Sequence, residues 1–457
     1  MERKNKMNVA VIGAGLTGLT TAFYLGKAGI GFQVFEKSDR PGGVIQTHKE
    51  NGFTFESGPN TGVLSRPEVV ELLEDLKDDC TLEPADETAK SRWIWKNGKW
   101  WPLPSGVKTG ITTPLFTLPD KFRLLTEPFR KKGDNPDESL AGLVLRRMGK
   151  SFLDYAIDPF ILGIYSGDPH QLVTKYAFPK LYNLEQDYGS FIGGAMKKAR
   201  QPKSERDKKA TGEIFSVEGG LGNLINALVK NIGPENIRLN CTDLVVQKND
   251  GYYTIGNEQE KFTHVVSATG GYALSELLPF IGKEELSPVL QMNYSKVAQV
   301  SLGFEKWEGI PLNAFGGLVP SVEKRRILGA LFLSSFLKNK APEQGALLSV
   351  FIGGVRKPEM SELTDDEITQ IVKEEISEMF QLPEFNPGLL KIFRYRHAIP
   401  QYGFESDEKM KTIDRLETQY PGLILAGNIR DGIGIADRIK QGKTIANQLT
   451  NKYGKEK

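Results

Sequence analysis

The chain has 457 residues, and its 59 Lys or Arg against 57 Asp or Glu leave a net charge of +2, which gives no field that attracts nucleic acid. A hydrophobic share of 39% and a charged share of 25% are ordinary for a globular protein, and the length favours two or three domains. Cys80 and Cys241 are far apart in the sequence and form neither a disulfide framework nor a metal-binding knuckle. We therefore expect no bound metal and no nucleic-acid partner, and this cysteine usage suits the cytoplasm.

The first elements of the chain predict a strand, a glycine turn, a helix and a second strand. Residues 9–12 form a short apolar strand, and apolar residues recur at helical spacing over 16–25. The helix is expected to end near Gly29, because glycine tolerates the backbone that closes a helix. Residues 32–35 then form a second strand, which ends on Glu36. This order is typical of the start of a nucleotide-binding fold.

The rest of the chain mixes helical, irregular and strand-like patterns. A stretch rich in Trp, Pro and Gly over 93–114 predicts irregular structure, 137–199 is mostly helical, and the polar segment 200–212 predicts a mobile surface loop. Helices are also predicted from the glycine pair 219–220 to about residue 230, over 364–380 and over 437–449. Strand-like runs occupy 239–247, 252–255, 297–304, 327–333, 347–352 and 423–426.

The turn after the first strand has the glycine spacing of a dinucleotide site. Gly13 permits a tight turn, Gly15 lets a pyrophosphate approach the backbone, and Gly18 lets the helix pack closely against the strand. The helix N-terminus offers free N–H groups and a positive dipole end to the phosphates. Glu36 stands where a carboxylate accepts hydrogen bonds from a ribose. The residues predicted to form this turn are Gly13, Ala14, Gly15, Leu16, Thr17 and Gly18.

Two further glycine-rich segments decide between NAD and FAD. Gly42 and Gly43 follow shortly after the ribose carboxylate, and the segment 425–435 leads from a strand into another helix. A second helix N-terminus that the backbone approaches closely suits the flavin end of a long cofactor. We therefore predict that the chain binds FAD.

Two segments in the helical part carry longer motifs. Residues 158–169 contain Asp158-Pro159, Gly163 and Asp168-Pro169, and a second motif occupies 177–194. Both resemble the helical region of the protoporphyrinogen oxidases, a branch of the flavin amine oxidase superfamily. The resemblance covers nearly the whole chain, and its substrate-site segments are most similar to the plant mitochondrial type. Further matching segments are 56–61, 101–106, 315–321, 328–332, 350–354 and 398–402.

The fold implied by this resemblance is α/β. It comprises a discontinuous Rossmann-like FAD-binding domain, a substrate-binding domain built on a mixed sheet, and a helical insertion. The expected boundaries are 1–90, 213–285 and 395–457 for the FAD-binding domain, 91–111 and 286–394 for the substrate-binding domain, and 112–212 for the helical domain.

The resemblance also implies roles for single residues. Cys241 is expected to contact the adenine end of FAD through its backbone, and Arg92 to pair with a propionate of the substrate. Leu318 and Leu331 would sandwich one pyrrole ring, Phe351 would stack on another, and Asn60 and Gly163 would lie beside the reacting edge of the flavin. The other implied FAD-binding positions are Lys37, Val44, Gly58, Pro59, Asn60, Thr61, Asn428, Ile433, Gly434 and Ile435. By pattern alone, Arg92 also suits a surface arginine that packs on Trp93 and Trp95.

The implied activity is the oxidation of protoporphyrinogen IX to protoporphyrin IX in haem biosynthesis. It proceeds by three two-electron hydride transfers to FAD, which we expect to be bound non-covalently because no cysteine follows Cys241. Oxygen or a quinone would accept the electrons. None of the histidines is assigned as an acid or base. One alternative is oxidation of coproporphyrinogen III to coproporphyrin III. A second is an amine oxidase, for which Lys296 lies near the expected lysine although Ala298 takes that position in the alignment of motifs.

Contact with a membrane is suggested by the apolar residues of 111–129. Leu115, Phe116, Leu118, Phe122, Leu124 and Leu125 either touch lipid at the inner face of the cell membrane or belong to a capped surface loop. The run 327–337 is too short to span a bilayer. Both a monomer and a homodimer are left open.

Overall fold

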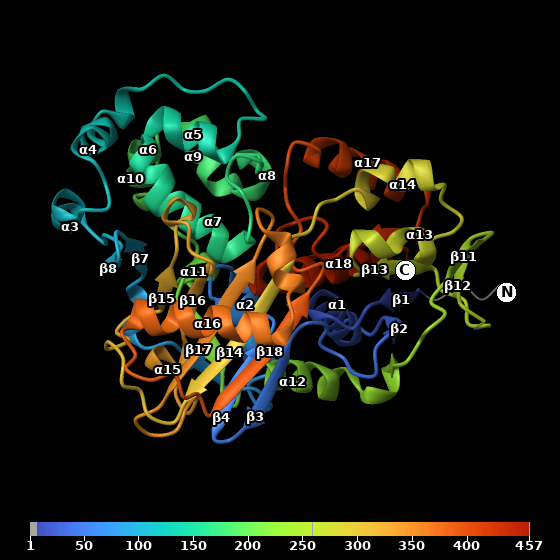
Figure 1. Cartoon of the computed structure of the whole chain (residues 1–457). Helices are drawn as coiled ribbons and strands as arrows, with labels where there is room; N and C mark the ends of the chain where they lie inside the picture. Colours follow the sequence, from blue (N-terminus) through green and yellow to red (C-terminus); the bar gives the residue numbers. More distant parts are fainter. Residues whose placement is uncertain (1–6, 258, 457) are drawn as a thin grey trace.

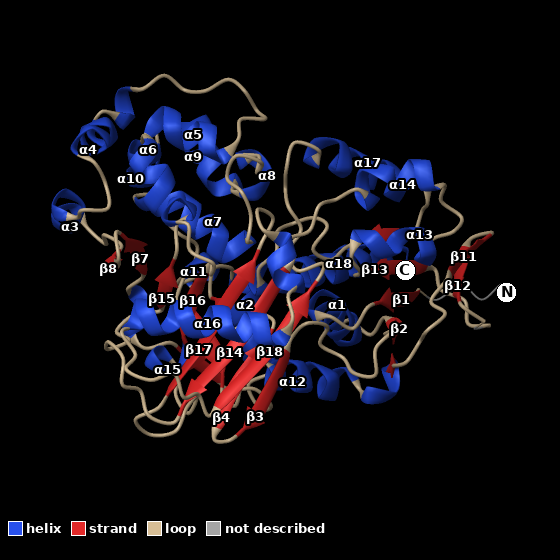
Figure 2. Ribbon diagram, viewed as in Figure 1, coloured by secondary structure: helices blue, strands red, loops and turns tan. Residues whose placement is uncertain are grey.

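Two sheets of different type organise the chain in a computed structural model, which describes residues 7–257 and 259–456. A five-stranded sheet has the order β10-β2-β1-β13-β19, and a seven-stranded sheet has the order β18-β14-β17-β16-β15-β7-β8. Figure 2 shows the larger sheet beside the smaller one, with a separate group of helices above one end of the larger sheet. This mixture of a parallel and a mixed sheet confirms the predicted α/β class.

The five-stranded sheet is parallel throughout. β1 (Asn8–Ile12) lies between β2 (Gly31–Phe35) and β13 (His264–Ser267), and β10 (Ile237–Arg238) and β19 (Leu423–Leu425) form the edges. Each strand is short and the central ones are apolar, as expected for a parallel sheet that is covered on both faces. Because all five strands run in the same direction, their carboxyl ends meet at one edge.

Helices cover both faces of the parallel sheet. On one face, α1 (Leu16–Lys27), α12 (Gly222–Ile232) and α18 (Ile435–Glu456) share a core cluster with β1. A Cβ added at Gly442 would lie 2.7 Å from the Thr17 carbonyl oxygen, so α18 and α1 approach closely at this glycine. On the other face, α14 (Lys283–Leu290) and α17 (Ser406–Gln419) pack with the hairpin of β11 (Val246–Asn249) and β12 (Tyr252–Ile255).

The seven-stranded sheet is antiparallel except where β15 (Gly316–Leu318) pairs with β7 (Trp93–Lys96). One face packs against α16 (Asp365–Phe380), which begins at a capping box formed by Thr364 and Glu367. The figures show α16 lying across the strands of this sheet. Its other strands are β14 (Val297–Phe304), β16 (Gly329–Phe332), β17 (Ala346–Gly353), β18 (Leu389–Tyr395) and β8 (Lys99–Pro102).

The helical part is held together by buried ion pairs. Arg147 is fully buried, pairs with Glu127 and donates to Glu185 across 2.7 Å. Such a network is strongly destabilised when one member is removed, because an unpaired buried charge remains. The helices are α3 (Val107–Thr112), α4 (Leu118–Leu125), α5 (Leu140–Arg147), α6 (Lys150–Phe152), a π-helical turn at Leu153–Ile157, α7 (Asp158–Tyr165), α8 (Thr174–Ala177), α9 (Pro179–Tyr188) and α10 (Phe191–Ala199).

Shorter elements complete the chain. They are the hairpin β3 (Gln46–Glu50) and β4 (Phe53–Ser57), the three-stranded sheet β5 (Gly62–Val63), β9 (Ile214–Val217) and β6 (Leu82–Pro84), and the helices α2 (Pro67–Asp75), α11 (Glu205–Lys208), α13 (Leu274–Leu277) and α15 (Leu333–Phe336). Within the described residues, no helix is both long and apolar enough to cross a bilayer.

The structure differs from three sequence predictions about secondary structure. The stretch 93–114 contains the β7–β8 hairpin rather than irregular structure, because its tryptophans pack into the sheet core. The polar segment 200–212 is mostly an exposed loop, as predicted, but it contains the short helix α11, whose Arg206 donates to Glu68 and Glu71 across 2.7 Å each. The strand expected over 239–247 is mostly a loop between β10 and β11, in which Asn240 and Cys241 donate to the backbone of Ser38 and Glu36 without forming a ladder. Elsewhere the predicted strands and helices are confirmed within a few residues.

Candidate functional site

The glycine turn follows β1 at the carboxyl edge of the parallel sheet. Gly13 has φ +99°, and a Cβ at Gly18 would lie 2.0 Å from the Gly13 carbonyl oxygen, so only glycine allows this contact between helix and strand. Gly15 is the N-cap of α1, has no side-chain cap, and a Cβ added there would have no neighbour within 4 Å. The N-terminus of α1 therefore opens onto free space, which fits the phosphates of a dinucleotide.

Glu36 and the second glycine pair fold back onto this turn. The Glu36 carboxylate is buried and accepts hydrogen bonds from the Ala14 N–H at 2.7 Å and the Ser38 N–H at 2.9 Å. The Gly42 N–H donates to the Ala14 carbonyl at 2.8 Å, and a Cβ at Gly43 would lie 3.4 Å from the Gly15 Cα. The structure thus brings together two glycine motifs that are separate in the sequence.

The remaining positions on the cofactor side join the same edge. The Cys241 N–H donates to the Glu36 carbonyl at 2.9 Å, which places its backbone beside the predicted ribose carboxylate. A Cβ at Gly58 would lie 2.3 Å from the Val44 carbonyl oxygen, so the two segments that contain these residues touch. Lys37 and Val44 are exposed, Pro59 and Thr61 are half-buried.

The C-terminal glycine-rich segment lies after β19, at the same edge. Gly427 is close to Ala268 and Thr269, which follow β13, and Gly13 also approaches Ala268. The Tyr402 hydroxyl lies 3.0 Å from the Asn428 carbonyl, to which it donates, and 3.2 Å from both the carbonyl and the N–H of Gly432. Ile435 begins α18, Gly434 precedes it, and Ile433 packs against the helical part. All the segments predicted to bind FAD therefore converge, and their open glycine backbone fits such a cofactor.

The residues expected at the substrate share one face of the mixed sheet. Alternation along the strands places Ala330, Phe332 and Val350 in the core beneath α16, so Leu331 and Phe351 lie on the opposite face. Across the sheet, Leu318 pairs with Gly329, which pairs with Phe351. A Cβ added at Gly329 would lie 2.6 Å from the Gly317 carbonyl oxygen and 3.5 Å from Leu318 Cδ2, so glycine here leaves room for the neighbouring strand and for the Leu318 side chain.

Gly163 connects this face to the helical part. It lies in α7, and a Cβ there would come within 2.7 Å of Leu318 Cδ2. The contact is held by Arg356, which follows β17 and donates to Asp158 at 2.6 Å and Asp168 at 2.7 Å. Burial raises the pKa of Asp168, but the neighbouring Arg356 guanidinium and the His170 N–H outweigh it, so the pKa is lowered overall. The segment 158–169 is therefore fixed above the sheet face.

Arg92 lies just before β7 on the same side of the sheet as Leu318. Its guanidinium stands 5.2 Å from the centre of the Phe315 ring, whereas Trp93 and Trp95 belong to the core on the α16 side. The alternative in which Arg92 packs on its neighbouring tryptophans is therefore wrong. Burial lowers the pKa of Arg92, and among the described residues no carboxylate pairs with it. A half-buried cation without a partner suits an anionic ligand group.

Polar residues beneath Asn60 were missed by sequence reasoning. Asn60 is 6% exposed, and its Nδ2 donates to Ser349 Oγ at 3.4 Å. Ser349 and the neighbouring Gln299 are buried polar residues in strands that are mostly apolar, and this break in the pattern was the available signal.

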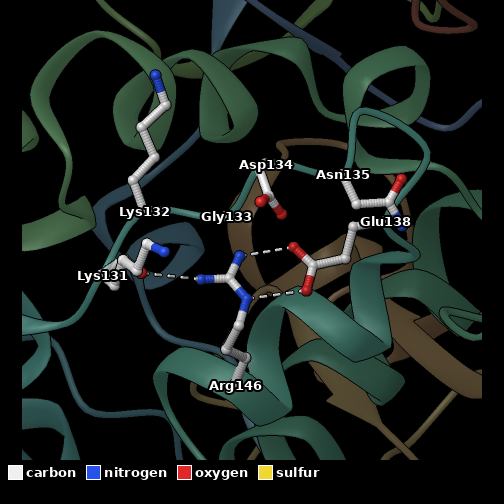
Figure 3. A pocket seen from close by; sticks show the side chains of 7 residues that line it. All are labelled: Lys131, Lys132, Gly133, Asp134, Asn135, Glu138 and Arg146. Atoms are coloured by element: carbon white, nitrogen blue, oxygen red, sulfur yellow. Dashed lines mark hydrogen bonds and ion pairs between the residues drawn. The ribbon is translucent and has the colours of Figure 1, made fainter.

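The other titratable residues considered from sequence lie apart from this face. Burial lowers the pKa of His264 in β13 to about 4, so the residue is neutral at pH 7. Lys296 pairs with Glu362 at 2.8 Å on the surface, and Ala298 is buried in the sheet core. No lysine therefore stands at the position that the amine oxidase alternative requires. The hollow in Figure 3, lined by Arg146 and Glu138, belongs to the helical part and contains none of the predicted site residues.

Comparison with known proteins identifies the family. The model of the family "flavin containing amine oxidoreductase" matches residues 16–450. Protoporphyrinogen oxidase 2, chloroplastic/mitochondrial, of Arabidopsis thaliana is 30% identical over 97% of this chain and 93% of its own length. Coproporphyrinogen III oxidase of Bacillus subtilis is 28% identical over 97% of this chain and 98% of its own length.

The solved structures support the same fold. A crystal structure from Exiguobacterium sp., assigned to the protoporphyrinogen oxidases, has a TM-score of 0.82 at 24% identity and covers 98% of this chain and 99% of its own. Cyclohexylamine oxidase from Brevibacterium oxydans has a TM-score of 0.71 at 14% identity, covering 98% and 99% respectively. These two likenesses concern the fold alone. The family match and the full-length relatives confirm the prediction of an FAD-dependent oxidoreductase. The chain belongs to the family of flavin-containing amine oxidoreductases.

Proposed function

We propose that this protein oxidises protoporphyrinogen IX to protoporphyrin IX in haem biosynthesis, in three two-electron steps. The observation that carries the proposal is the full-length similarity to protoporphyrinogen oxidases, which includes a relative 30% identical over 97% of the chain. The sheet face supports it, because Leu318, Leu331 and Phe351 offer apolar surface to a flat ring system.

The residues of the site are proposed to bind and orient rather than to transfer protons. Leu318 and Leu331 would sandwich one pyrrole ring of the macrocycle, Phe351 would stack on another, and Arg92 would bind a propionate at the rim. Asn60 and Gly163 would lie beside the reacting edge of the flavin and help to exclude water from it. When bound, FAD supplies the two-electron acceptor for each oxidation. Orientation is enough for such a step, because the electron-rich pyrroles stabilise the developing positive charge.

Oxidation of coproporphyrinogen III to coproporphyrin III is a second candidate, because the Bacillus subtilis relative is named for that activity. The two substrates differ in their number of carboxylates, and Arg92 is the one unpaired cation that we assign to the proposed site. Initial rates of the purified holoenzyme with protoporphyrinogen, coproporphyrinogen and a panel of amines test the proposal. We expect the highest kcat/KM for protoporphyrinogen. A higher kcat/KM for coproporphyrinogen or for an amine would contradict the proposed activity and assign that substrate instead.

The electron acceptor and the division into domains are also proposals. Either oxygen or a quinone would reoxidise the flavin, and assays under argon with a soluble quinone separate the two. We propose that 1–90, 213–285 and 395–457 form the FAD-binding domain, that 91–111 and 286–394 form the substrate-binding domain, and that 112–212 form the helical domain. The parallel sheet, the mixed sheet and the group of helices in Figure 1 support this division.

Peripheral contact with the inner face of the cell membrane is proposed for the segment 111–129, which includes α4. Leu118 is 68% exposed, Phe122 67%, Leu125 71% and Phe129 88%, which together form an exposed apolar surface. Leu115 and Phe116 do not belong to it. They are buried, and Phe116 stacks on Phe152 with ring centres 3.9 Å apart.

Vesicle flotation tests this contact. Phe122→Glu combined with Phe129→Glu should move the protein from the vesicle fraction to the soluble fraction while FAD content stays the same, because a buried charge opposes insertion. Phe404→Glu is the matched control, since Phe404 is 60% exposed outside the helical part. If both variants partition like the unmodified protein, the segment 111–129 is a surface loop.

A further inference from the structure

A buried glutamine in the mixed sheet is bonded to the segment that leads into Asn60. Gln299 lies in β14 and is 1% exposed. Its Oε1 accepts from the Gly58 N–H at 3.0 Å, and its Nε2 donates to the Glu56 carbonyl at 3.0 Å and to Ser349 Oγ at 3.0 Å. A buried amide is unfavourable unless it is hydrogen-bonded. In Gln299 the carbonyl oxygen and both N–H groups of the side chain have hydrogen-bond partners.

These bonds allow a single orientation of the Gln299 amide. The Gly58 N–H can only donate and the Glu56 carbonyl can only accept, so turning the amide over would oppose like groups at both contacts. Gln299 therefore joins β14, the strand next to the β18 edge of the mixed sheet, to the backbone of 56–58 as a rigid link. The segment is independently held by the close approach of Gly58 to the Val44 carbonyl.

Ser349 extends the link to Asn60. Its hydroxyl oxygen accepts from Gln299 Nε2 at 3.0 Å and from Asn60 Nδ2 at 3.4 Å. The bond to Nδ2 leaves Asn60 Oδ1 as a buried acceptor, and within the described residues this atom has no partner. A buried acceptor without a partner costs free energy that a bound N–H donor recovers.

We propose that Gln299 is a positioning residue for the site. It fixes the backbone of 56–58 beside the flavin and, through Ser349, holds Asn60 so that Oδ1 receives an N–H donor of the bound flavin or of the substrate. The inference rests on the proposed placement of Gly58 to Thr61 at the flavin. It does not depend on which substrate is oxidised.

Gln299→Met tests the link to the flavin. Methionine has a similar length without hydrogen-bonding groups, so the Gly58 N–H and the Glu56 carbonyl would lose their partner. We expect the dissociation constant of FAD from the reconstituted protein to rise about tenfold, which corresponds to about 1.4 kcal/mol. We also expect the visible absorption spectrum of the bound flavin to shift. An unchanged dissociation constant with an unchanged spectrum would overturn the proposal.

Ser301→Ala is the matched control. Ser301 lies two residues further along β14, is 1% exposed, and its hydroxyl has no partner in the part of the chain that the structure describes. Its removal should leave FAD affinity and the flavin spectrum unchanged. If Ser301→Ala shifts them as much as Gln299→Met, the effect comes from disturbing the sheet and the proposal fails.

Ser349→Ala distinguishes the two possible donors and serves if Gln299→Met does not fold. It keeps both bonds from Gln299 to the backbone and releases Asn60. A shifted flavin spectrum without substrate means that the flavin donates to Asn60. A raised KM with unchanged spectrum and FAD affinity means that the substrate donates. If none of these quantities changes, the role of Ser349 and Asn60 is wrong. Because FAD binding is measured without substrate, failure here is distinct from failure of the proposed activity.

Discussion

The cofactor side and the substrate side of the proposed site are built in different ways. The cofactor side consists mainly of backbone at the carboxyl ends of parallel strands, where Gly13 and Gly42 allow close contacts between segments and Gly15 leaves open space at the N-terminus of α1. The substrate side consists of side chains that share one face of a mixed sheet, such as Leu318 and Phe351. Each stretch of the backbone site consists of residues that are adjacent in the sequence. The residues of the sheet face are far apart in the sequence, and only strand pairing brings them together.

The largest effect on FAD binding is expected when a side chain is introduced into the open space of the cofactor side. Gly15→Asp places a carboxylate in the open space at the N-terminus of α1, where it would repel a pyrophosphate. We expect a folded protein that retains no FAD after gel filtration. Gly106→Asp is the matched control, because Gly106 is also an N-cap glycine with open space, at the start of α3. Normal flavin content in Gly15→Asp would show that the turn does not bind phosphate.

Complete release of the flavin is expected because the backbone side offers no covalent bond. Cys80 is buried among the residues of the core cluster around α1, and Cys241 joins Glu36 through its backbone. Acid precipitation should transfer all the yellow colour to the supernatant. Colour that stays with the pellet would reveal a covalent attachment and would contradict a site made of backbone alone.

A side chain also supports the backbone side, and its effect should depend on pH. Lys409 is fully buried, stands 4.5 Å from the centre of the Tyr402 ring, and burial lowers its pKa from 10.5 to about 8. Below pH 8 both the folded and the unfolded protein carry the charge. Between pH 8 and 10.5 the unfolded protein keeps the proton while the folded protein loses it, so the free energy of unfolding rises with pH. The rise should amount to about 3 kcal/mol.

Urea unfolding at several pH values measures this rise. Lys409→Met should remove it and raise stability at pH 7. Lys411→Met should keep it, because Lys411 lies on the same helix but pairs with Asp407 at the surface. A rise that persists in Lys409→Met must come from another group.

The substrate side should show the smallest effect for a single change. Arg92→Ala removes a charge-assisted hydrogen bond worth about 1.5–3 kcal/mol, so KM should rise by a factor of about 10 to 150. The value of kcat should change little, because a propionate at the rim is bound alike in the ground and transition states. Arg325→Ala is the control, since Arg325 stands over Trp95 and pairs with Glu375 on the other side of the sheet. A KM equal to that of the unmodified protein would mean that Arg92 only packs on Phe315.

The two sides also differ in how far sequence alone predicts them. The strand, turn and helix around Gly13 are local, and the hydrogen bond of Ala14 to Glu36 follows from the usual geometry of such a fold. The row of Leu318, Gly329 and Phe351 is formed by three strands that pair side by side in the sheet. Register of this kind is set by tertiary packing, so only the family resemblance suggested it.

Errors in the prediction have the same origin. Phe116 matched the apolar pattern of a membrane contact. However, it stacks on Phe152, and this contact depends on how α6 packs against the loop between α3 and α4. The polar segment 200–212 is mostly a surface loop as predicted, but its lack of apolar periodicity hid the short helix α11, whose Arg206 reaches Glu68 and Glu71 in α2. In both cases the partner lies in another segment, and no local pattern contains it.

The strand order has a consequence for the time at which the protein becomes active during synthesis. β1 (Asn8–Ile12) is made first, its neighbour β13 (His264–Ser267) emerges only after the mixed sheet has begun, and β19 (Leu423–Leu425) comes near the end. Pairing of such distant segments is slow, because long loops must close before the contacts form. A nascent chain therefore carries the glycine turn for most of its synthesis without the strands that complete the edge. FAD can be captured only late, and until then the exposed parallel strands depend on protection from aggregation.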